Sequence, residues 1–335
     1  MKHNFFRYLF VICALVFAFG ESAMAQAGEA AQMFRGTLIE HLIEMSLIFD
    51  NNNKVTGNYQ YVGATGQLTL KGRREGDRLT LDEFDPGGKR TGSFRCDIKA
   101  DAEEKTKTLE CLWSKPASKA EYSATLTEQH IEFSGALQIV TKTIAEKRLG
   151  ILAAYPQIIG GNTQAVTAFN RRAAALAAKA VSDYKKDYEP GPKRSYFSLD
   201  YNISLATDDL ISVEFSKQSF AGGAYPDSEY DDLNFNLSGA GREIKIEELF
   251  VPKSKFEGAI QTFSLKSINQ GLETDSKLPA DMVAGFDKWT MTRHGIIVYY
   301  DFPHVIAALS RVFVPYSVVR SDLSKNGPAR FAIKP

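Results

Sequence analysis

The sequence predicts an α+β fold: an N-terminal antiparallel β meander, folded as a barrel or a sandwich, followed by a domain of mixed helices and strands. Two observations lead to this prediction. Residues 33–140 form short stretches of alternating apolar and polar residues between glycine-containing turns, a pattern typical of antiparallel sheets. From about residue 145 an alanine-rich helical pattern interrupts the strands, and helices that interrupt an antiparallel sheet define the α+β class.

Length and charge limit the classes of function. The 335 residues include 40 Lys and Arg and 40 Asp and Glu, so the formal net charge is zero. Nucleic-acid binding needs a basic excess to neutralise phosphates, so no nucleic-acid partner is expected. At about 150 residues per domain, the length predicts two domains.

The first 25 residues have the three parts of an export signal. Lys2 and Arg7 precede an apolar run over 8–19, and Ala23-Met24-Ala25 supplies the small-x-small pattern for cleavage. The run is well short of the roughly 20 residues that span a bilayer. Residues 1–25 are therefore predicted to be a signal peptide, and the mature chain to be periplasmic or secreted without a transmembrane anchor. A buried helix or an uncleaved anchor is the alternative.

Cys96 and Cys111 are the two cysteines that remain after the predicted cleavage. Both lie in short predicted strands, and an oxidising compartment makes a disulfide the default for such a pair. The bond would close a loop of about 15 residues, worth ~3 kcal/mol in the chain-entropy model. A redox or metal role is not expected, because the chain has no CxxC motif and no clustered His.

The first domain is expected to span residues 30–142 and to consist of strands only. Turns are predicted at Asp50–Asn53 and Pro86–Gly88, where Asp, Asn, Pro and Gly gather. Lys54–Tyr59 and Lys89–Phe94 share a Thr-Gly-x-aromatic pattern, which indicates equivalent positions in two hairpins. A binding role for these two segments is the alternative.

The second domain is expected to span residues 145–330. A helix capped by Asn162 and ending near Tyr184, and a second helix opened by a Ser254–Glu257 capping box and ending at Gly271, follow from their capping and spacing signals. The predicted strands are 195–206 and 210–220 around a turn at 207–209, a hairpin of 286–292 with 295–301, and 311–316, before a short helix at 317–323.

Several segments of this second domain occur in a characteristic order. They are Ala154–Ile158, Ser212–Phe215, Phe220–Tyr225, Asn234–Arg242, Ile246–Phe250, Trp289–Tyr300 and Phe313–Ser317. In this order, residues 145–325 resemble the extracytoplasmic domain of unknown function shared by the lysozyme-sensing anti-sigma factor RsiV and the non-catalytic region of the peptidoglycan deacetylase PdaC. The chain departs from that family at Tyr225, where His is usual, and at Phe302-Pro303-His304, where the family has an aromatic-Pro-Tyr segment.

The resemblance implies binding at the cell envelope, not catalysis. The chain shows neither the membrane and sigma-binding segments of such an anti-sigma factor nor the deacetylase module. It also has no GxSxG, no P-loop and no GxGxxG after a strand. His41, His130, His294 and His304 have no zinc-site spacing. No catalytic residue, cofactor or metal ligand is therefore assigned.

A candidate binding loop follows from the glycine turn. Gly222 and Gly223 allow a close backbone approach, and exposed Tyr is a frequent interface anchor. The predicted site residues are Gly222, Gly223, Tyr225, Asp227, Glu229, Asp231 and Asp232. The four carboxylates would attract a cationic protein such as lysozyme. A folding turn with a solvated acidic loop is the alternative, and a calcium site at the carboxylates lacks the glycine and distal Glu of an EF-hand.

Two functions therefore stay open. The first is an exported, non-catalytic envelope binding protein that recognises lysozyme or a peptidoglycan-related ligand. The second is a periplasmic enzyme or a glycan-binding module that acts on cell-wall material through exposed aromatic side chains.

Overall fold

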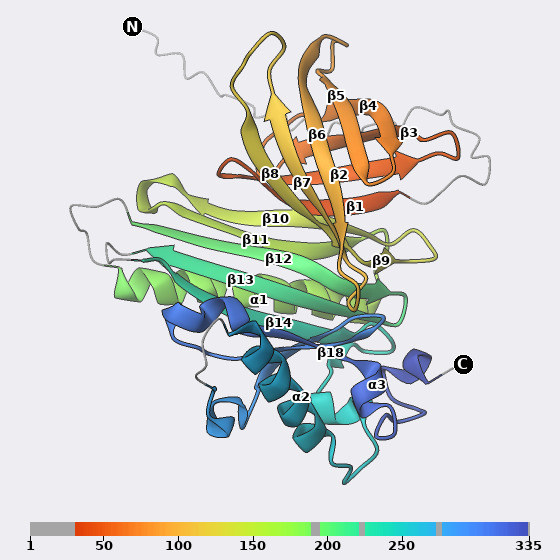
Figure 1. Ribbon diagram of the computed structural model, residues 1–335, viewed down its shortest axis with the longest axis vertical. Helices are drawn as coiled ribbons and strands as arrows, with labels where there is room; N and C mark the ends of the chain where they lie inside the picture. The colour runs from red at the N-terminus through yellow and green to blue at the C-terminus, as the bar shows by residue number, and fades with distance from the viewer. Residues whose placement is uncertain (1–30, 189–194, 221–224, 273–276, 334–335) are drawn as a thin grey trace, which may run out of the picture.

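The computed structural model describes residues 31–188, 195–220, 225–272 and 277–333. The predicted signal peptide, residues 1–25, lies outside these ranges, as do Gly222 and Gly223. Three layers are stacked along the long axis of the molecule: a β-barrel, a twisted seven-stranded sheet with one long helix, and a small three-stranded sheet with further helices (Figure 1). The predicted α+β fold is confirmed.

The N-terminal meander closes into a barrel. Each strand pairs antiparallel with the next along the chain, and the first also pairs with the eighth. The strands are β1 (Gln32–Leu38), β2 (His41–Phe49), β3 (Lys54–Tyr61), β4 (Leu68–Glu75), β5 (Arg78–Phe84), β6 (Arg90–Ala100), β7 (Lys107–Ser114) and β8 (Tyr122–Gln129). Closure leaves neither edge of this sheet unpaired.

The two Thr-Gly-x-aromatic segments occupy equivalent positions, as predicted. Tyr59 of β3 and Phe94 of β6 are both buried in the barrel, with ring centroids 5.4 Å apart. The glycine of the second segment is required by packing, because a Cβ on Gly92 would lie 2.5 Å from Nε1 of Trp113. Cys96 and Cys111 face each other across β6 and β7 and form the predicted disulfide, with Cα atoms 3.9 Å apart.

One end of the barrel is closed by a buried carboxylate. Glu83 is 3% exposed and accepts hydrogen bonds from Tyr59 Oη at 2.6 Å, Thr91 Oγ1 at 2.6 Å and Trp113 Nε1 at 2.7 Å. Burial, together with this carboxylate, raises the pKa of Tyr59 far above its ordinary value. Three neutral donors thus satisfy a carboxylate that is almost fully buried.

The second layer is a sheet in the order β10-β11-β12-β13-β14-β15, with β9 paired beside β12. Its strands are β9 (Ile131–Glu132), β10 (Gln138–Glu146), β11 (Ile151–Ile159), β12 (Tyr196–Thr207), β13 (Leu210–Phe220), β14 (Asp227–Asn236) and β15 (Arg242–Glu243). The barrel ends at Gln129, so β9 and the first residues of β10, which the sequence assigned to the all-β domain over 30–142, pair within the second sheet. Alternation alone cannot tell which sheet a strand joins.

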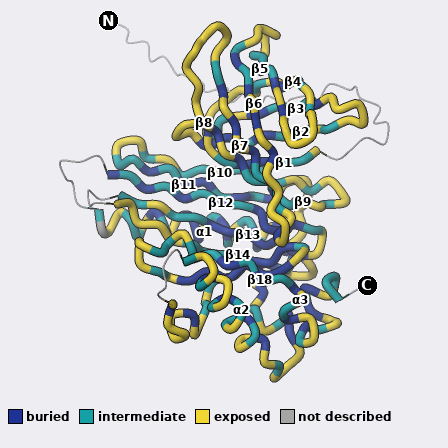
Figure 2. The backbone as a smooth tube through the Cα atoms, viewed as in Figure 1, coloured by how far each residue is buried: buried dark blue, intermediate teal, exposed yellow. Residues whose placement is uncertain are grey.

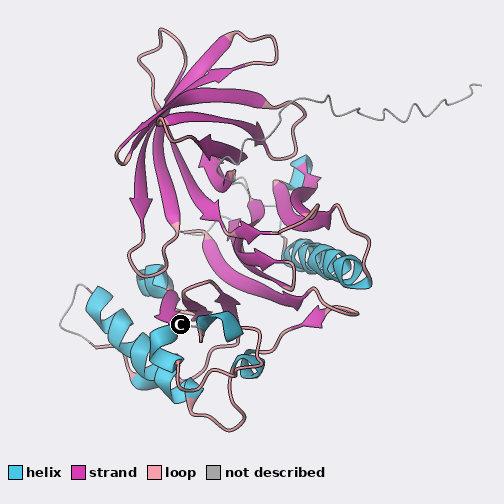
Figure 3. Cartoon of the chain, turned by 90° about the vertical axis from the view of Figure 1, so that its right-hand side faces the viewer, coloured by secondary structure: helices cyan, strands magenta, loops and turns pink. Residues whose placement is uncertain are grey.

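Helix α1 (Gln164–Asp187) covers one face of this sheet (Figure 3). Its apolar side, including Phe169 and Ala173, packs on Val213 and Phe235 in the largest core. The N-cap is Thr163, whose Oγ1 accepts from Val166 N at 3.2 Å, and not Asn162 as predicted. Both residue types can cap a helix, so the sequence located the turn but not the capping position.

The third layer packs on the opposite face of β13 and β14. It consists of β16 (Lys288–Met291), β17 (Gly295–Tyr299) and β18 (Arg311–Pro315), with α2 (Phe256–Gly271), α3 (Tyr316–Val319) and the short 3-10 helices η2 (Ile246–Leu249), η3 (Ala280–Val283), η4 (His304–Leu309) and η5 (Arg330–Ala332). A further 3-10 helix, η1 (Lys147–Leu149), connects β10 and β11 in the second layer. The predicted hairpin of β16 and β17 is confirmed. The predicted capping box is wrong, because α2 begins at Phe256 without a side-chain cap.

The two sheets are joined by side chains in strand interiors. Ser212 Oγ accepts from Met291 N at 2.8 Å, and Asn234 Nδ2 donates to Trp289 O at 2.7 Å. All four residues are buried, and in Figure 2 the strands at the centre of the molecule are drawn mostly as buried or intermediate. Among the helices of the described residues, none is long and apolar enough to cross a membrane.

A buried Arg fixes the barrel on the sheet. Arg35 of β1 is 2% exposed and forms ion pairs with Glu44 and, at 2.7 Å, with Asp200 of β12. It also donates to Thr141 Oγ1 at 2.8 Å and lies 4.1 Å from the centre of the Tyr201 ring.

A second connection runs through Arg311 of β18. The guanidinium of Arg311 binds Glu104 of the barrel with both Nη atoms, at 2.9 and 2.8 Å, and Glu214 of β13 through Nε at 3.0 Å. Glu104 is linked through Thr106 to His130, and Glu214 accepts from Tyr299 Oη. We call these six side chains the bridging network.

Candidate functional site

A pocket of about 440 Å³ opens where the beginning of β14 meets the end of the β16–β17 hairpin and η4. We call it the aromatic pocket. The lining residues that determine its chemistry are Tyr230, Lys288, Tyr299, Tyr300, Phe302 and His304. Five of these side chains carry rings. Ligand pockets typically combine aromatic walls with a few placed polar groups.

Three pairs of stacked rings lead from the floor of the pocket to its rim. Tyr230 lies on Tyr299 with centroids 4.9 Å apart, and Tyr300 lies on Phe302 at 5.6 Å. At the rim, Tyr225 stacks on His304 at 4.3 Å, and Tyr225 is 65% exposed. Offset stacking of this kind stabilises ring pairs beyond the apolar area that they bury.

The strand pattern of β17 explains why the floor is rigid. Successive side chains of an extended chain point to opposite faces. Tyr299, the last residue of β17, therefore reaches Glu214 and Thr290, while the next residue, Tyr300, packs in the core with α2. Both tyrosines are 4% exposed. Burial, and then the charge of Glu214, raises the pKa of Tyr299 well above its ordinary value. Its hydroxyl therefore stays protonated at neutral pH.

Charged groups surround the aromatic floor. Lys288 Nζ lies 3.7 Å from Asp301 Oδ1, and the Asp301 side chain is 85% exposed. Glu229 and Asp227 belong to the same pocket wall. The arrangement offers ring faces for an apolar surface together with a cation and carboxylates for hydroxyl or amide groups.

The structure brings Tyr225 of the predicted site to the rim of this pocket. The four predicted carboxylates are not in a loop, however. Asp227 to Asp232 form the first part of β14, paired with β13 from Ser219↔Asp227 to Glu214↔Asp232. Acidic residues disfavour strands, but here cross-strand pairs and the buried Leu233 and Phe235 farther along β14 outweigh that preference.

The carboxylates also do not form one cluster. Lys217, directly opposite in β13, binds Glu229 at 2.8 Å and Asp231 at 3.7 Å. This lysine lowers the pKa of Glu229. Asp232 points to the other face, accepts from Asn234 Nδ2 at 2.8 Å, and has its pKa raised to about 7 by burial and by the neighbouring Asp231. Alternation along the strand thus divides the acidic charge between two environments.

Sequence reasoning missed four residues of the aromatic pocket: Tyr230, Lys288, Tyr299 and Tyr300. The signal that could have found them is the Tyr299-Tyr300 doublet at the end of a predicted strand. Aromatic residues are common in buried strands, so the doublet alone does not distinguish core from pocket. Within the ranges that the structure describes, no group of three His, Cys, Asp or Glu residues is arranged for a metal ion.

The chain is therefore an α+β protein in which a closed barrel is joined to a layered sheet domain. No protein-family model matches it, and no curated protein matches it. Solved structures similar to it include a DUF3298 family member from Bacteroides fragilis NCTC 9343 and a DUF3298 family protein from Pseudomonas aeruginosa PAO1. Each is 15% identical with a TM-score of 0.40; they cover 59% and 57% of this chain, and 98% and 94% of their own.

Neither structure is described as RsiV or PdaC, so the resemblance to those two proteins stays a prediction. Similarity at this level leaves the function to be argued from the site itself.

Proposed function

We propose that the protein is an exported, non-catalytic binding protein of the cell envelope that holds a cell-wall glycan in the aromatic pocket. The observation that carries the proposal is the series of three stacked ring pairs, which changes from buried at Tyr299 to exposed at Tyr225. A sugar ring has one apolar C–H face and a periphery of hydroxyls. The pocket offers aromatic faces for the first and charged groups for the second.

Size and rigidity support this ligand class. A volume of about 440 Å³ lies within the range of roughly 300–1,000 Å³ found for small-ligand pockets. Tyr299 is held by Glu214, which Arg311 also binds. A preformed floor reduces the entropy that binding would otherwise cost.

The charges at the rim support binding over hydrolysis. A glycoside hydrolase needs one carboxylic acid with a raised pKa near the scissile bond. At this rim, Lys217 lowers the pKa of Glu229, and Asp301 is paired with Lys288. Asp232, the carboxyl with a raised pKa, is bonded to Asn234 within the fold.

Lysozyme recognition is the second candidate, and the exposed rim favours it. Tyr225 is 65% exposed and the adjacent surface includes Val305, which is 88% exposed. Such a rim suits a protein partner as well as a glycan. Electrostatic attraction would be weaker than a cluster of four free carboxylates implies, because Lys217 offsets Glu229 and Asp231.

Co-sedimentation with insoluble peptidoglycan tests the proposal. We expect saturable binding that soluble muropeptides compete away, and a loss of about tenfold in affinity for Tyr225→Ala. Tyr122→Ala is the matched control, since Tyr122 is 38% exposed on the barrel, away from the pocket. Absence of saturable sedimentation, or an equal loss for both variants, would overturn the glycan proposal. A parallel pull-down with lysozyme distinguishes the second candidate: capture of lysozyme without glycan binding, lost in Tyr225→Ala, favours it.

A further inference from the structure

Besides the aromatic pocket, the molecule has a hollow in the barrel, at the end opposite Glu83. Strand register determines which side chains enter it, because cross-strand partners point to the same face of a sheet. Gln32 pairs with Leu47, Phe49 with Val55, Arg74 with Leu79 and Glu128 with Phe34. All four partners belong to the barrel core. The register therefore directs Gln32, Phe49, Arg74 and Glu128 inward at this end, which we call the barrel mouth.

The two ends of the barrel differ in how their polar groups are satisfied. At the closed end, Glu83 has three short hydrogen bonds and is 3% exposed. At the barrel mouth, a hollow of about 810 Å³ remains open beside the second sheet. The polar groups at the Glu83 end are thus buried and hydrogen-bonded within the barrel, while the charged groups at the barrel mouth stay in contact with solvent.

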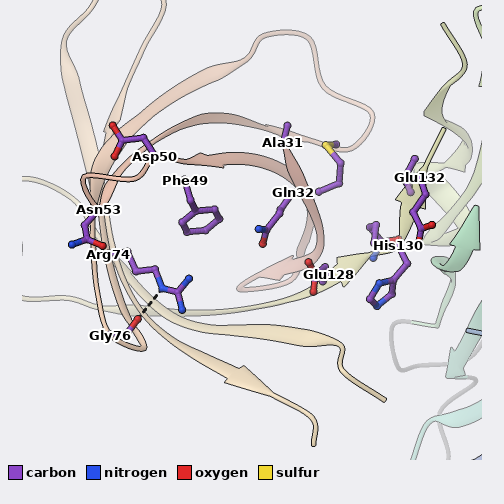
Figure 4. Close-up of a pocket in the computed structure, with 13 residues that line it drawn as sticks. Ala31, Gln32, Phe49, Asp50, Asn53, Arg74, Gly76, Glu128, His130 and Glu132 are labelled. Carbon is purple, nitrogen blue, oxygen red and sulfur yellow. Dashed lines mark hydrogen bonds between the residues drawn. The ribbon is translucent and has the colours of Figure 1, made fainter. Parts of the chain in front are cut away.

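Arg74 and Glu128 lie on opposite walls of the barrel mouth. Figure 4 shows Arg74, Asp50 and Asn53 on one wall, Gln32 and Glu128 on the other, and the ring of Phe49 between them. The separation places an apolar surface between a cationic group and an anionic group.

Arg74 keeps the capacity to bind an anion. Its Nε donates to Gly76 O at 2.8 Å, which leaves both Nη groups directed away from that bond. Its ion pair with Asp77 is long, 4.0 Å, and the Asp77 side chain is 86% exposed. A planar guanidinium with two outer donors is suited to a carboxylate.

Glu128 keeps the capacity to bind a cation. Lys107 forms an ion pair with it at 3.3 Å through Nζ and donates to it at 3.2 Å through the backbone N, and the same Nζ donates to Gln32 Oε1 at 3.0 Å. A carboxylate has about four acceptor positions, so these long contacts do not fill it. The Gln32 amide and the Asp50 carboxylate add further acceptors around the hollow.

We propose that the barrel mouth binds a small zwitterion, a free amino acid or short peptide, with its carboxylate on Arg74, its ammonium on Glu128 and its apolar part against Phe49. A ligand with one charge would gain a charge-assisted contact at one wall only. A zwitterion satisfies both walls. The site is independent of the aromatic pocket and does not rest on the glycan proposal.

Calorimetry of the purified protein with three dipeptide probes tests the inference. The probes are Ala-Ala, N-acetyl-Ala-Ala, which lacks the ammonium, and Ala-Ala amide, which lacks the carboxylate. We expect saturable binding of Ala-Ala and a loss of about tenfold or more when either charge is removed. No saturable binding of Ala-Ala, or equal binding of all three probes, would overturn the proposal.

Variants locate the charges. The Arg74→Gln variant should bind Ala-Ala and Ala-Ala amide equally, because it lacks the guanidinium that distinguishes a carboxylate from an amide. Arg73→Gln is the matched control, since Arg73 is the preceding residue of β4 and is exposed on the outer face. Glu128→Gln should likewise abolish the preference for Ala-Ala over its N-acetyl form. Tyr225→Ala should leave dipeptide binding unchanged, which separates this site from the aromatic pocket. Loss of binding in Arg73→Gln equal to that in Arg74→Gln would contradict the assignment.

Discussion

Replacing Asp232 by Asn is expected to make folding more stable at alkaline pH and to remove a pH dependence. Asp232 lies in β14 opposite Glu214, and burial together with Asp231 raises its pKa from 3.8 to about 7. Between these two values the folded state binds a proton that the unfolded state has released. The free energy of unfolding of the native protein therefore falls as pH rises from about 4 to about 7, and is level above that range.

The magnitude follows from the size of the pKa change. The interval from 3.8 to about 7 corresponds to about 4 kcal/mol at 1.36 kcal/mol per pKa unit for a fully dry carboxyl. Asp232 keeps partial contact with solvent, and water screens the ionised form. We therefore expect Asp232→Asn to gain roughly 2 kcal/mol at pH 8. The Asn side chain keeps an acceptor oxygen for the bond from Asn234.

Urea denaturation at pH 4, 5.5, 7 and 8, monitored by tryptophan fluorescence, measures the difference in the free energy of unfolding between Asp232→Asn and the native protein. Trp113 in the barrel and Trp289 in the small sheet are both buried, so the signal covers both parts of the chain. The stability of Asp232→Asn relative to the native protein should be near zero at pH 4, grow up to about pH 7 and then level off. Asp227→Asn, at the exposed beginning of the same strand, should show no such trend. A difference that stays constant over the pH range would refute the reasoning.

Three further predictions concern stability and use the same denaturation assay. Arg35→Met should lose about 3 kcal/mol, because it leaves Asp200 and a second carboxylate without their cation; combining it with Asp200→Asn should restore part of the loss, and full additivity would contradict the pairing. Glu83→Leu should cost roughly 3 kcal/mol, because two buried donors and one half-buried donor lose their acceptor; a cost below about 1 kcal/mol would show that water reaches this end. Replacing Cys96 and Cys111 together by Ser should cost ~3 kcal/mol for their sequence separation of 15 residues, and reductant should then have no further effect on the variant.

Local patterns in the sequence were sufficient for much of the fold. Alternation identified β12, β13 and the β16–β17 hairpin, since each pairs with its neighbour along the chain and its turn residues are local. The same holds for the Cys96–Cys111 disulfide, which joins adjacent strands. The length of α1 was also near its observed value, because an alanine-rich segment has a high helix propensity.

Features that depend on distant pairs could not be predicted. Closure of the barrel requires β1 to pair with β8, and no local pattern encodes that contact. Asp227–Asp232 looked like a loop because four acidic residues are poor strand formers, whereas Lys217 in the adjacent strand neutralises two of them. The aromatic pocket combines Tyr230 of β14 with Tyr299 of β17. These residues are far apart in the sequence and meet because the third layer packs against β14, a contact that no local pattern encodes.

The bridging network has a consequence for ligands that carry more than one recognition group. Its first member, His130, lines the barrel mouth, and its last, Tyr299, lines the aromatic pocket. Because Arg311 binds carboxylates from both parts of the chain, the two hollows are held at a set separation. A molecule that reaches both gains effective concentration for the second contact only if its own length matches that separation, and one that is too short gains none. The protein would then select linked ligands by length as well as by chemistry.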